Sequence, residues 1–347
     1  MNGQFKDAKI LIVGGTGTIG QSLLQEILKD NPEVVRLFSR DEFKQFQLQQ
    51  EYKEYTNIRY LIGDVRDYNR LERAMQDIDY VFHTAAMKHV PACEYNPFEA
   101  VQTNVLGTQN VIQAALACNV KKVIFTSTDK AISPTNTYGA SKLMAERLIT
   151  AAQYQAGSKQ TKFAAVRFGN VMGSRGSVIP LFRWQIENKR KITITNKQMT
   201  RFMMSLEEAT ELTLKAAQLA RGGEIFVLKM PIIRLNDLAN IIIDNTSMYL
   251  GINSDSVEIE EMGLRPGEKM YEELMTEEES YHAYETKEMY VIPNVFLNEN
   301  YDDLQKAQHQ SYSSCFSNPI EYGDLYDLLL KANLLYQNTL SSSLSRK

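Results

Sequence analysis

Short apolar runs alternate with helical patterns over the first half of the chain. Five runs rich in β-branched and aromatic residues occupy residues 10–13, 34–38, 58–62, 80–83 and 123–126. Between the first two runs, apolar residues recur at helical spacing from Ile19 to Leu28, and Asn31 and Pro32 then end that helix. Strands that alternate with amphipathic helices predict βαβ units. We therefore expect an α/β fold built on a doubly wound parallel sheet.

The alternation weakens after a sixth strand predicted over residues 163–168. A glycine-rich segment follows at 169–176, and we place the change of lobe there. Residues 1–172 are expected to form the main lobe, and residues 173–200 with 236–347 a smaller, interleaved C-terminal lobe. A helix at 206–219, a strand at 225–228 and a helix at 235–243 indicate that the chain returns to the main lobe at about residues 201–235.

Composition and charge narrow the class of protein. The 347 residues are 44% hydrophobic and 23% charged, which is typical of a folded globular chain. A net charge of −4 provides no broad positive surface for nucleic acid or anionic membranes. No apolar run approaches the roughly 18 residues of a membrane span, and the N-terminus lacks a signal-peptide pattern. We expect a soluble, cytoplasmic protein with small-molecule ligands and without a nucleic-acid or membrane partner.

The cysteines give no sign of a metal or disulfide framework. Cys93, Cys118 and Cys315 are odd in number, widely spaced and without a CxxC pattern. We expect reduced thiols and no metal site.

A glycine-rich turn stands between the first predicted strand and the first helix. Gly14, Gly15, Gly17 and Gly20 satisfy both G-x-G-x-x-G and G-x-x-G-x-x-G. Glycines permit a tight turn and close backbone approach, and the helix N-terminus presents free N–H groups to a pyrophosphate. In a complete βαβ unit this pattern predicts a Rossmann dinucleotide site. Its residues are Gly14, Thr16, Gly17, Thr18, Ile19 and Gly20.

The end of the second strand indicates which dinucleotide binds. Ser39 stands where an acidic residue would select NAD, and Arg40 and Lys44 offer charges suited to a 2′-phosphate, which favours NADP. The alternative is that Arg40 and Lys44 form a solvated basic face and Asp41 binds the ribose, which would select NAD. Asp64, with Val65, is a candidate adenine contact, although an acidic loop residue is as often a turn former.

Two short motifs carry candidate chemistry. Tyr138 and Lys142 lie one turn apart on a predicted helix, where a nearby ammonium favours a phenolate that can act as a base. Thr128, Asp129 and Lys130 follow the fifth strand. A hydroxyl there suffices for dehydrogenation or epimerisation, whereas an adjoining carboxyl and amine supply an acid and a base for an elimination. The alternative is that Asp129 and Lys130 are exposed turn residues.

Together, the segments 14–20, 128–130 and 138–142 resemble the extended short-chain dehydrogenases/reductases, specifically the polysaccharide-biosynthesis group of UDP-N-acetylglucosamine 4,6-dehydratases. The resemblance spans roughly residues 8 to 280. Further matching segments are 39–42, 85–91, 168–171, 173–177, 199–202 and 265–269. Related dehydratases of dTDP-glucose carry glutamate where Lys130 stands, which points to the N-acetylglucosamine branch. Tyr138 favours the branch that inverts C5.

The resemblance implies roles for further residues. Tyr138, Lys142 and Thr128 would support oxidation at C4, Lys130 would remove the C5 proton, and Asp129 would assist departure of the C6 hydroxyl. NADP would stay tightly bound and be recycled within each turnover. Ala85, Ala86 and Lys88 would line the cofactor site. The implied contacts to UDP-N-acetylglucosamine are Lys88, Asn170, Arg175, Thr200, Arg201, Arg265 and Glu268. For each arginine the alternative is an ion pair between lobes.

Several alternatives stay open at this stage. The same enzyme class includes variants that retain the C5 configuration or release a 5,6-unsaturated sugar. A nucleotide-sugar 4-epimerase would not need Asp129 and Lys130, and a non-catalytic NADP-binding regulator would not need Tyr138 and Lys142. The resemblance further implies a homo-oligomer, either a dimer or a hexamer, and a role in making glycan precursors such as pseudaminic acid for flagellin glycosylation.

Overall fold

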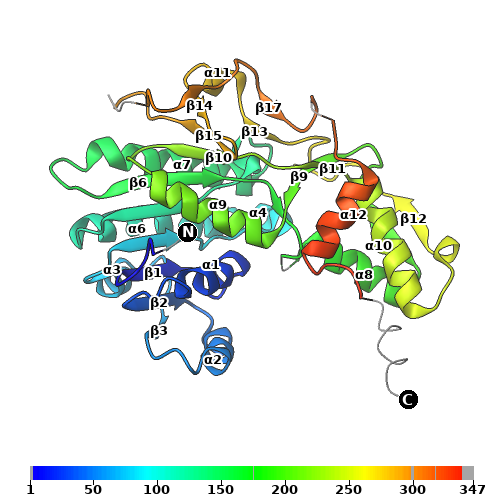
Figure 1. Cartoon of the computed structure of the whole chain (residues 1–347), viewed down its shortest axis with the longest axis horizontal. Helices are drawn as coiled ribbons and strands as arrows, with labels where there is room; N and C mark the ends of the chain where they lie inside the picture. Colours follow the sequence, from blue (N-terminus) through cyan, green and yellow to red (C-terminus); the bar gives the residue numbers. More distant parts are fainter. Residues whose placement is uncertain (1–2, 175, 298–300, 317, 338–347) are drawn as a thin grey trace. The chain divides into compact units, whose positions relative to one another are not determined.

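The computed structural model describes residues 3–174, 176–297, 301–316 and 318–337. The chain forms two compact units, each built from three segments. Unit 1 contains Met1–Gly169, Glu208–Lys229 and Glu273–Tyr312, and unit 2 contains Asn170–Glu207, Met230–Glu272 and Ser313–Lys347. Figure 1 labels the elements along the chain.

Unit 1 is built on a ten-stranded sheet with the order β16-β14-β15-β10-β6-β5-β4-β1-β2-β3. Neighbours from β3 to β10 run parallel, and the order β3-β2-β1-β4-β5-β6 is that of doubly wound dinucleotide-binding folds. The parallel strands are β1 (Lys9–Val13), β2 (Val34–Ser39), β3 (Ile58–Ile62), β4 (Tyr80–His83), β5 (Lys122–Thr126), β6 (Lys162–Arg167) and β10 (Ile225–Leu228). The predicted fold class is confirmed.

The central strands are apolar because helices cover both faces of a parallel sheet. Residues 10–13 of β1 are 0% exposed, and Val123, Ile124 and Phe125 of β5 are at most 1% exposed. The helical elements of unit 1 are α1 (Thr18–Leu28), α2 (Glu42–Glu51), α3 (Tyr68–Met75), α4 (Val90–Tyr95), α5 (Pro97–Ala100), η1 (Val101–Leu106), α6 (Gly107–Ala117), η2 (Asp129–Ala131), α7 (Thr137–Gln155), α9 (Leu206–Leu219) and α11 (Glu277–Ser280).

Three short antiparallel strands extend the sheet beyond β10. β15 (Met289–Ile292) pairs with β10, β14 (Tyr284–Glu285) pairs with β15, and β16 (Gln305–Lys306) pairs with β14. Strands of two to four residues carry almost no periodic signal, so the sequence pattern did not predict this edge.

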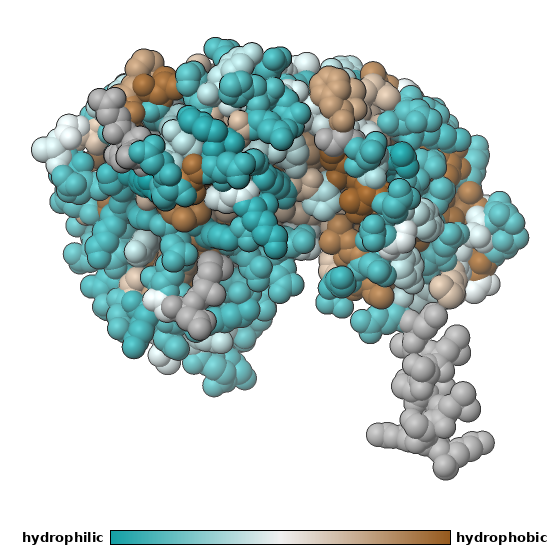
Figure 2. Space-filling model, turned by 45° about the horizontal axis from the view of Figure 1, so that its top comes forward, coloured by the Kyte–Doolittle hydropathy of each residue, from teal (hydrophilic) through white to brown (hydrophobic). Residues whose placement is uncertain are grey.

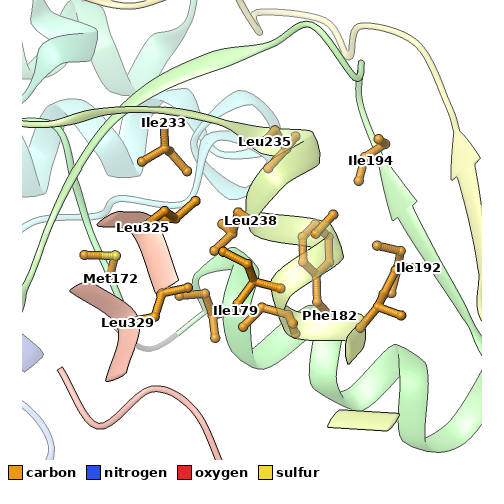
Figure 3. Close-up of a cluster of buried hydrophobic side chains, with 14 of the residues drawn as sticks. Met172, Ile179, Phe182, Ile192, Ile194, Ile233, Leu235, Leu238, Leu325 and Leu329 are labelled. Atoms are coloured by element: carbon orange, nitrogen blue, oxygen red, sulfur yellow. The ribbon is translucent and has the colours of Figure 1, made fainter. Parts of the chain in front are cut away.

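Unit 2 has its own apolar core. β7 (Asn170–Val171) runs parallel to β9 (Thr200–Met204), which pairs with β11 (Ile232–Arg234), and β8 (Lys191–Ile194) runs parallel to β12 (Glu258–Glu261). The helical elements are α8 (Val178–Lys189), α10 (Leu235–Leu250), η3 (Ser254–Ser256) and α12 (Tyr322–Lys331). Figure 3 shows Ile179 and Phe182 of α8, Leu238 of α10 and Leu325 and Leu329 of α12 meeting in this core. A separate two-stranded sheet pairs β17 (Tyr312–Ser313) with β13 (Glu273–Met275), which belongs to unit 1.

The helix at 206–219 and the strand at 225–228 agree with the predicted ranges, and the predicted helix at 235–243 extends to Leu250. The predicted division into two lobes stays a prediction, and its bounds can be compared with those of the two units. Residues 273–312 were expected in the smaller lobe, and they belong to unit 1.

The surface shown in Figure 2 is mainly hydrophilic, with apolar residues in separate patches. Among the described residues, no helix is both long and apolar enough to cross a membrane. Cys93, Cys118 and Cys315 are free thiols, of which Cys93 is buried.

Candidate active site

The turn after β1 has a backbone that only glycine fits. Gly14 has φ +87°, and a Cβ atom there would lie 2.7 Å from the backbone nitrogen of Ala85. A Cβ on Gly20 would lie 2.6 Å from the carbonyl oxygen of Gly14. The first glycine therefore lets the turn pass close to the loop after β4, and the last lets α1 pack on the turn.

The N-terminus of α1 meets the requirements of a pyrophosphate site. Gly17 precedes the helix without a side-chain cap, and its own N–H donates to the carbonyl of Gly14 at 2.8 Å. The first N–H groups of a helix have no partners within that helix, and the dipole makes this end positive. The turn thus suits a dinucleotide, and the predicted contacts from Gly14 to Gly20 stay a prediction.

The end of β2 is organised by a residue that sequence reasoning missed. Gln45 of α2 is buried, and its Nε2 donates to the Ser39 hydroxyl at 2.9 Å, to the Ser39 carbonyl and to the Leu61 carbonyl. The Ser39 hydroxyl therefore has an internal partner. A glutamine on a polar helix gives no sequence signal for this role.

Charged residues around this strand end are already paired. Asp41 caps α2 by accepting from the backbone N–H of Lys44, and its carboxylate lies 2.5 Å from the Lys44 ammonium. Arg40 lies 3.6 Å from the carboxylate of Asp64, and Arg66 donates to the same carboxylate through two nitrogens. Although burial of Asp64 acts in the opposite direction, hydrogen bonds from Arg66 and the charges of Arg66 and Arg40 lower its pKa.

Asp129 and Lys130 form a close pair at the end of β5. The carboxylate oxygen Oδ1 of Asp129 accepts from the Thr128 hydroxyl at 2.7 Å, the Lys130 N–H at 2.9 Å and the Lys130 ammonium at 3.0 Å. Asp129 is 1% exposed, and its second oxygen, Oδ2, is buried without a hydrogen-bond partner. A buried acceptor left unpaired is costly, which is typical of a group kept for a ligand or for chemistry.

Tyr138 lies at the start of α7 and interacts with the same pair. Burial raises the pKa of Tyr138 to about 12, while the charge of Lys130 and a hydrogen bond with Thr128 act in the opposite direction. Lys130 is thus a cation that favours the phenolate here. The predicted support of Tyr138 by Lys142 stays a prediction.

Lys142 points back into the sheet from α7. Its ammonium donates to the carbonyl of Thr126 at 2.6 Å and lies 3.8 Å from the centre of the Phe125 ring. Burial lowers the pKa of Lys142 to about 7, and the charge of Glu146 opposes this. The lysine that the Y-x-x-x-K spacing identified is thus buried among β5 residues.

A buried asparagine ties the loop after β4 to α7. Asn104 of η1 accepts from the backbone N–H of Met87 at 2.8 Å and donates to the Met87 carbonyl and the Ser141 hydroxyl. Ser141 in turn donates to the Tyr138 carbonyl at 2.8 Å. Sequence reasoning missed Asn104, because η1 is a π-helical turn that ordinary helical periodicity does not reveal.

The predicted cofactor residues of this loop lie next to Met87 in the sequence: Ala85, Ala86 and Lys88. Both alanines are partly buried, and Lys88 is exposed. Val65, the neighbour of Asp64, is buried against Gly107 of α6.

In unit 2, Arg201 makes internal contacts. Its guanidinium donates to the carbonyls of Thr200, Lys269 and Met270, and it lies 4.0 Å from the carboxylates of Glu268 and Glu272. Arg201 is 7% exposed. It therefore holds the segment 268–272 against β9, and its predicted contact with substrate stays a prediction.

The other predicted substrate-binding residues of unit 2 differ in their contacts and their exposure. The Thr200 hydroxyl donates to the Ser314 carbonyl at 2.9 Å, and Glu268 accepts from the Thr195 hydroxyl at 3.1 Å. Arg265 is exposed, and Asn170 begins β7. Arg175 lies outside the described residues.

The described residues include no group of three or more His, Cys, Asp or Glu side chains that could hold a metal ion.

Comparison with known proteins places the chain in a family. Residues 10–294 match the family described as "Polysaccharide biosynthesis protein". The chain belongs to this family. Its members are extended short-chain dehydrogenases/reductases, so the predicted resemblance is confirmed.

Proteins similar to this chain carry different names. A Campylobacter jejuni protein named "UDP-N-acetylglucosamine 4,6-dehydratase (inverting)" is 43% identical over 290 residues, 83% of each chain. A Rickettsia bellii protein named "UDP-glucose 4-epimerase" is 40% identical over 344 residues, 96% of this chain and 98% of its own. An "uncharacterized membrane protein" of Methanocaldococcus jannaschii is 50% identical over 288 residues, 83% of this chain and 86% of its own.

A solved structure also resembles the whole chain. The X-ray structure of Pen from Bacillus thuringiensis is 56% identical, with a TM-score of 0.91 over 96% of this chain and 100% of that chain.

Proposed function

We propose that this protein is an NADP-dependent UDP-N-acetylglucosamine 4,6-dehydratase, a lyase that gives a 4-keto-6-deoxy sugar with inversion at C5. The observation that carries the proposal is the pair formed by Asp129 and Lys130 beside Tyr138. An elimination needs one base and one acid near the same bond, and these two groups lie 3.0 Å apart. Transfer of one proton from Lys130 to Asp129 would give a neutral amine and a neutral carboxylic acid together.

The protein's own residues then have separate tasks. While Lys130 is still charged, Tyr138 takes the proton of the C4 hydroxyl, and the proton transfer from Lys130 to Asp129 follows. Once C4 has also lost its hydride, the resulting C4 ketone acidifies the C5 proton, which Lys130 accepts. Asp129 protonates the departing C6 hydroxyl, which leaves as water, and a proton returned to the opposite face of C5 inverts that centre. When bound, NADP would accept a hydride from C4 and return it to C6.

The preference for NADP rests on the charges at the end of β2. The Asp41 carboxylate already caps α2 and pairs with Lys44, so it is engaged away from a ribose. Arg40 keeps a side chain that is 59% exposed, which leaves its guanidinium accessible to a 2′-phosphate. The cofactor released by denaturing the purified protein, identified by mass spectrometry, tests this part. Recovery of NAD alone would refute it.

The resemblance assigns the nucleotide half of the substrate to Asn170, Arg175, Arg201, Arg265 and Glu268. Arg265 is the best placed for a diphosphate because it is exposed, whereas Arg201 is buried on backbone carbonyls. We therefore assign Arg265 a direct contact and Arg201 the support of Glu268.

We further propose a cytoplasmic homo-oligomer that supplies a glycan precursor, as in pseudaminic acid formation for flagellin glycosylation. Apolar side chains are exposed on α4, α5, η1 and α7 of unit 1: Tyr95 87%, Phe98 65%, Val101 38%, Leu106 46% and Met144 52%. These four elements contact one another, and exposed apolar side chains on neighbouring elements are typical of a protein interface. Light scattering of the wild type and of Phe98→Lys tests the assembly, and a monomeric wild type would refute it.

A second candidate, a nucleotide-sugar 4-epimerase, is favoured by the Rickettsia bellii relative, which matches 96% of this chain. Incubation with UDP-N-acetylglucosamine and no added cofactor separates the two. Mass spectrometry should show a product lighter by one water. A product of unchanged mass with an inverted C4 would establish the epimerase instead.

A further inference from the structure

His83, the last residue of β4, is a buried histidine that has no part in the proposed chemistry. It is completely buried, and it pairs with Val13 of β1 on one side and with Phe125 of β5 on the other. Burial, followed by the charge of Lys142, lowers the pKa of His83 to about 3, so its imidazole is neutral. A neutral imidazole donates from one nitrogen and accepts at the other, so its role depends on which nitrogen carries the hydrogen.

The hydroxyl of Thr108 decides which nitrogen that is. Thr108 of α6 is also completely buried, and its Oγ1 lies 3.0 Å from Nε2 of His83. The same hydroxyl donates to the carbonyl of Asn104 at 2.7 Å. Because a hydroxyl has a single hydrogen, Oγ1 accepts from the Nε2–H of His83. The second ring nitrogen, Nδ1, is then a bare acceptor, buried without a hydrogen-bond partner among the described residues.

Asn104 extends this hydrogen-bond chain to two segments of the site. Its side-chain amide accepts from the N–H of Met87 at 2.8 Å, and it donates to the Met87 carbonyl at 3.0 Å and to the Ser141 hydroxyl at 2.9 Å. Ser141 donates to the carbonyl of Tyr138 at 2.8 Å. An unbroken chain of hydrogen bonds therefore runs from His83 to the backbone of Tyr138, with a branch to the loop after β4.

The chain crosses a segment that departs from ordinary helical geometry. Asn104 lies in η1, a π-helical turn that ends directly before α6 begins at Gly107. Turns of this kind are rare and are frequent at functional sites. The hydroxyl of Thr108 reaches back four residues to the Asn104 carbonyl, so it holds this turn from within the regular helix.

We propose that the buried pair of His83 and Thr108 positions Tyr138. The Nε2–H of His83 orients the hydroxyl, the hydroxyl holds the π-helical turn, and the amide in that turn holds the start of α7. The effect on turnover rests on the proposed function, because it assumes that Tyr138 takes a proton from the sugar. The hydrogen-bond chain itself can be measured without substrate.

The first measurement is NMR of the full-length protein labelled with ¹⁵N in its histidine rings. The chain has four histidines, and the other three, His89, His282 and His309, are exposed. Replacing these three with glutamine leaves only the signals of His83. Nε2 should carry the hydrogen and Nδ1 should be bare. A hydrogen on Nδ1 would mean that Thr108 donates to the ring instead, which would overturn the proposal.

Turnover separates a positioning role from a purely structural one. Thr108→Val removes the hydroxyl and keeps the shape, whereas Thr108→Ser keeps the hydroxyl. Per molecule of bound cofactor, Thr108→Val should have a kcat about 10–100-fold lower, because misplacing a reacting group by about 1 Å can cost about 100-fold. Its KM should be unchanged, since the nucleotide half is assigned to unit 2, and Thr108→Ser should resemble the wild type. A wild-type kcat in Thr108→Val would overturn the proposal.

Thr213→Val is the matched control. Thr213 of α9 is also completely buried, and its hydroxyl donates to the carbonyl of Ala209, four residues earlier, at 2.6 Å. This is the same kind of bond, on a helix outside the chain that runs from His83 to Tyr138. Both valine variants should lose stability in urea, but only Thr108→Val should lose kcat. Equal losses of kcat in the two variants would refute the positioning role.

The wild type keeps the test valid if Thr108→Val fails to fold, because the position of the hydrogen on His83 is measured without that variant. Failure of the dehydratase proposal is a separate result. It appears as the absence of a dehydrated product from the wild type, and it leaves the histidine signals unchanged.

Discussion

Lys130 interacts with two reacting groups, and replacing it in two ways should separate its tasks. Its ammonium pairs with Asp129 at 3.0 Å, and its charge favours ionisation of Tyr138. Lys130→Arg keeps the positive charge but cannot serve as a base, because a guanidinium stays protonated. Lys130→Met removes both the charge and the base.

The expected magnitudes follow from these two tasks. Loss of a general base costs about 10²–10⁴-fold in rate, or about 3–5.5 kcal/mol, and both variants should lose water from the sugar this much more slowly. Loss of a nearby charge shifts a pKa by about one unit or more. Because burial already raises the Tyr138 pKa to about 12, Lys130→Met should slow proton removal at C4 by about tenfold further, while Lys130→Arg should not.

Two assays report on the two steps. Rapid mixing of enzyme and UDP-N-acetylglucosamine, followed by the absorbance of reduced nicotinamide, measures oxidation at C4. Mass spectrometry of the quenched sugar measures loss of water. Cofactor content, determined on each purified variant, is the control for an intact binding site.

The reasoning predicts that Lys130→Arg oxidises C4 and then stops. Loss of water at the wild-type rate in Lys130→Arg would remove this residue as the base. Equal rates of C4 oxidation in Lys130→Arg and Lys130→Met would show that its charge does not act on Tyr138.

Three further changes test other parts of the account. The Gly14→Ala variant should purify with little bound dinucleotide. The φ of +87° at Gly14 is strained for alanine, and the new Cβ would lie 2.7 Å from the backbone nitrogen of Ala85. A cofactor content equal to that of the wild type would contradict this. The Arg40→Ala variant should bind NADP about 10–150-fold more weakly, the equivalent of about 1.5–3 kcal/mol, and should bind NAD almost as well as the wild type. Calorimetry measures both affinities. Equal losses of affinity for NADP and NAD would argue against a 2′-phosphate contact. Although burial acts in the opposite direction, the charge of Arg167 and its hydrogen bonds at 2.9 and 3.0 Å lower the pKa of Glu279 below its usual value of 4.5. This carboxylate therefore stabilises the fold above about pH 4.5, and the contribution is lost as pH falls through the lowered pKa. Urea unfolding of Glu279→Gln should give a free energy of unfolding about 1.5–3 kcal/mol lower than that of the wild type at pH 7. This variant should also lose less stability on acidification than the wild type. Parallel curves of stability against pH would refute the link between stability and the ionisation of Glu279.

Local signals in the sequence predicted much of the fold. The parallel strands of unit 1 consist of apolar, β-branched runs, and each appears within a residue or two of its predicted range. The β-strand at 225–228 and the helix at 206–219 were placed correctly as well. The antiparallel edge formed by β14, β15 and β16 was not, because its pairing joins short segments far apart in sequence.

The parts of the candidate site that a sequence motif specifies could be predicted. The parts that depend on a tertiary contact could not. Glycine spacing identified the turn at Gly14, and the strand end identified Asp129 and Lys130. Asn104 was missed, because its role depends on which buried groups it meets and no spacing encodes that. The influence of Lys130 on Tyr138 was also missed, because it depends on how the loop after β5 folds.

The most direct test of the central claim is NMR of the protein with UDP-N-acetylglucosamine in deuterated water, with no cofactor added. The account predicts a 4-keto-6-deoxy product that carries deuterium at an inverted C5, formed by cofactor that stays bound. Olefinic signals or a retained C5 would place the protein with dehydratases of another outcome. A product that keeps its C6 hydroxyl and gains an inverted C4 would contradict the elimination assigned to Asp129 and Lys130.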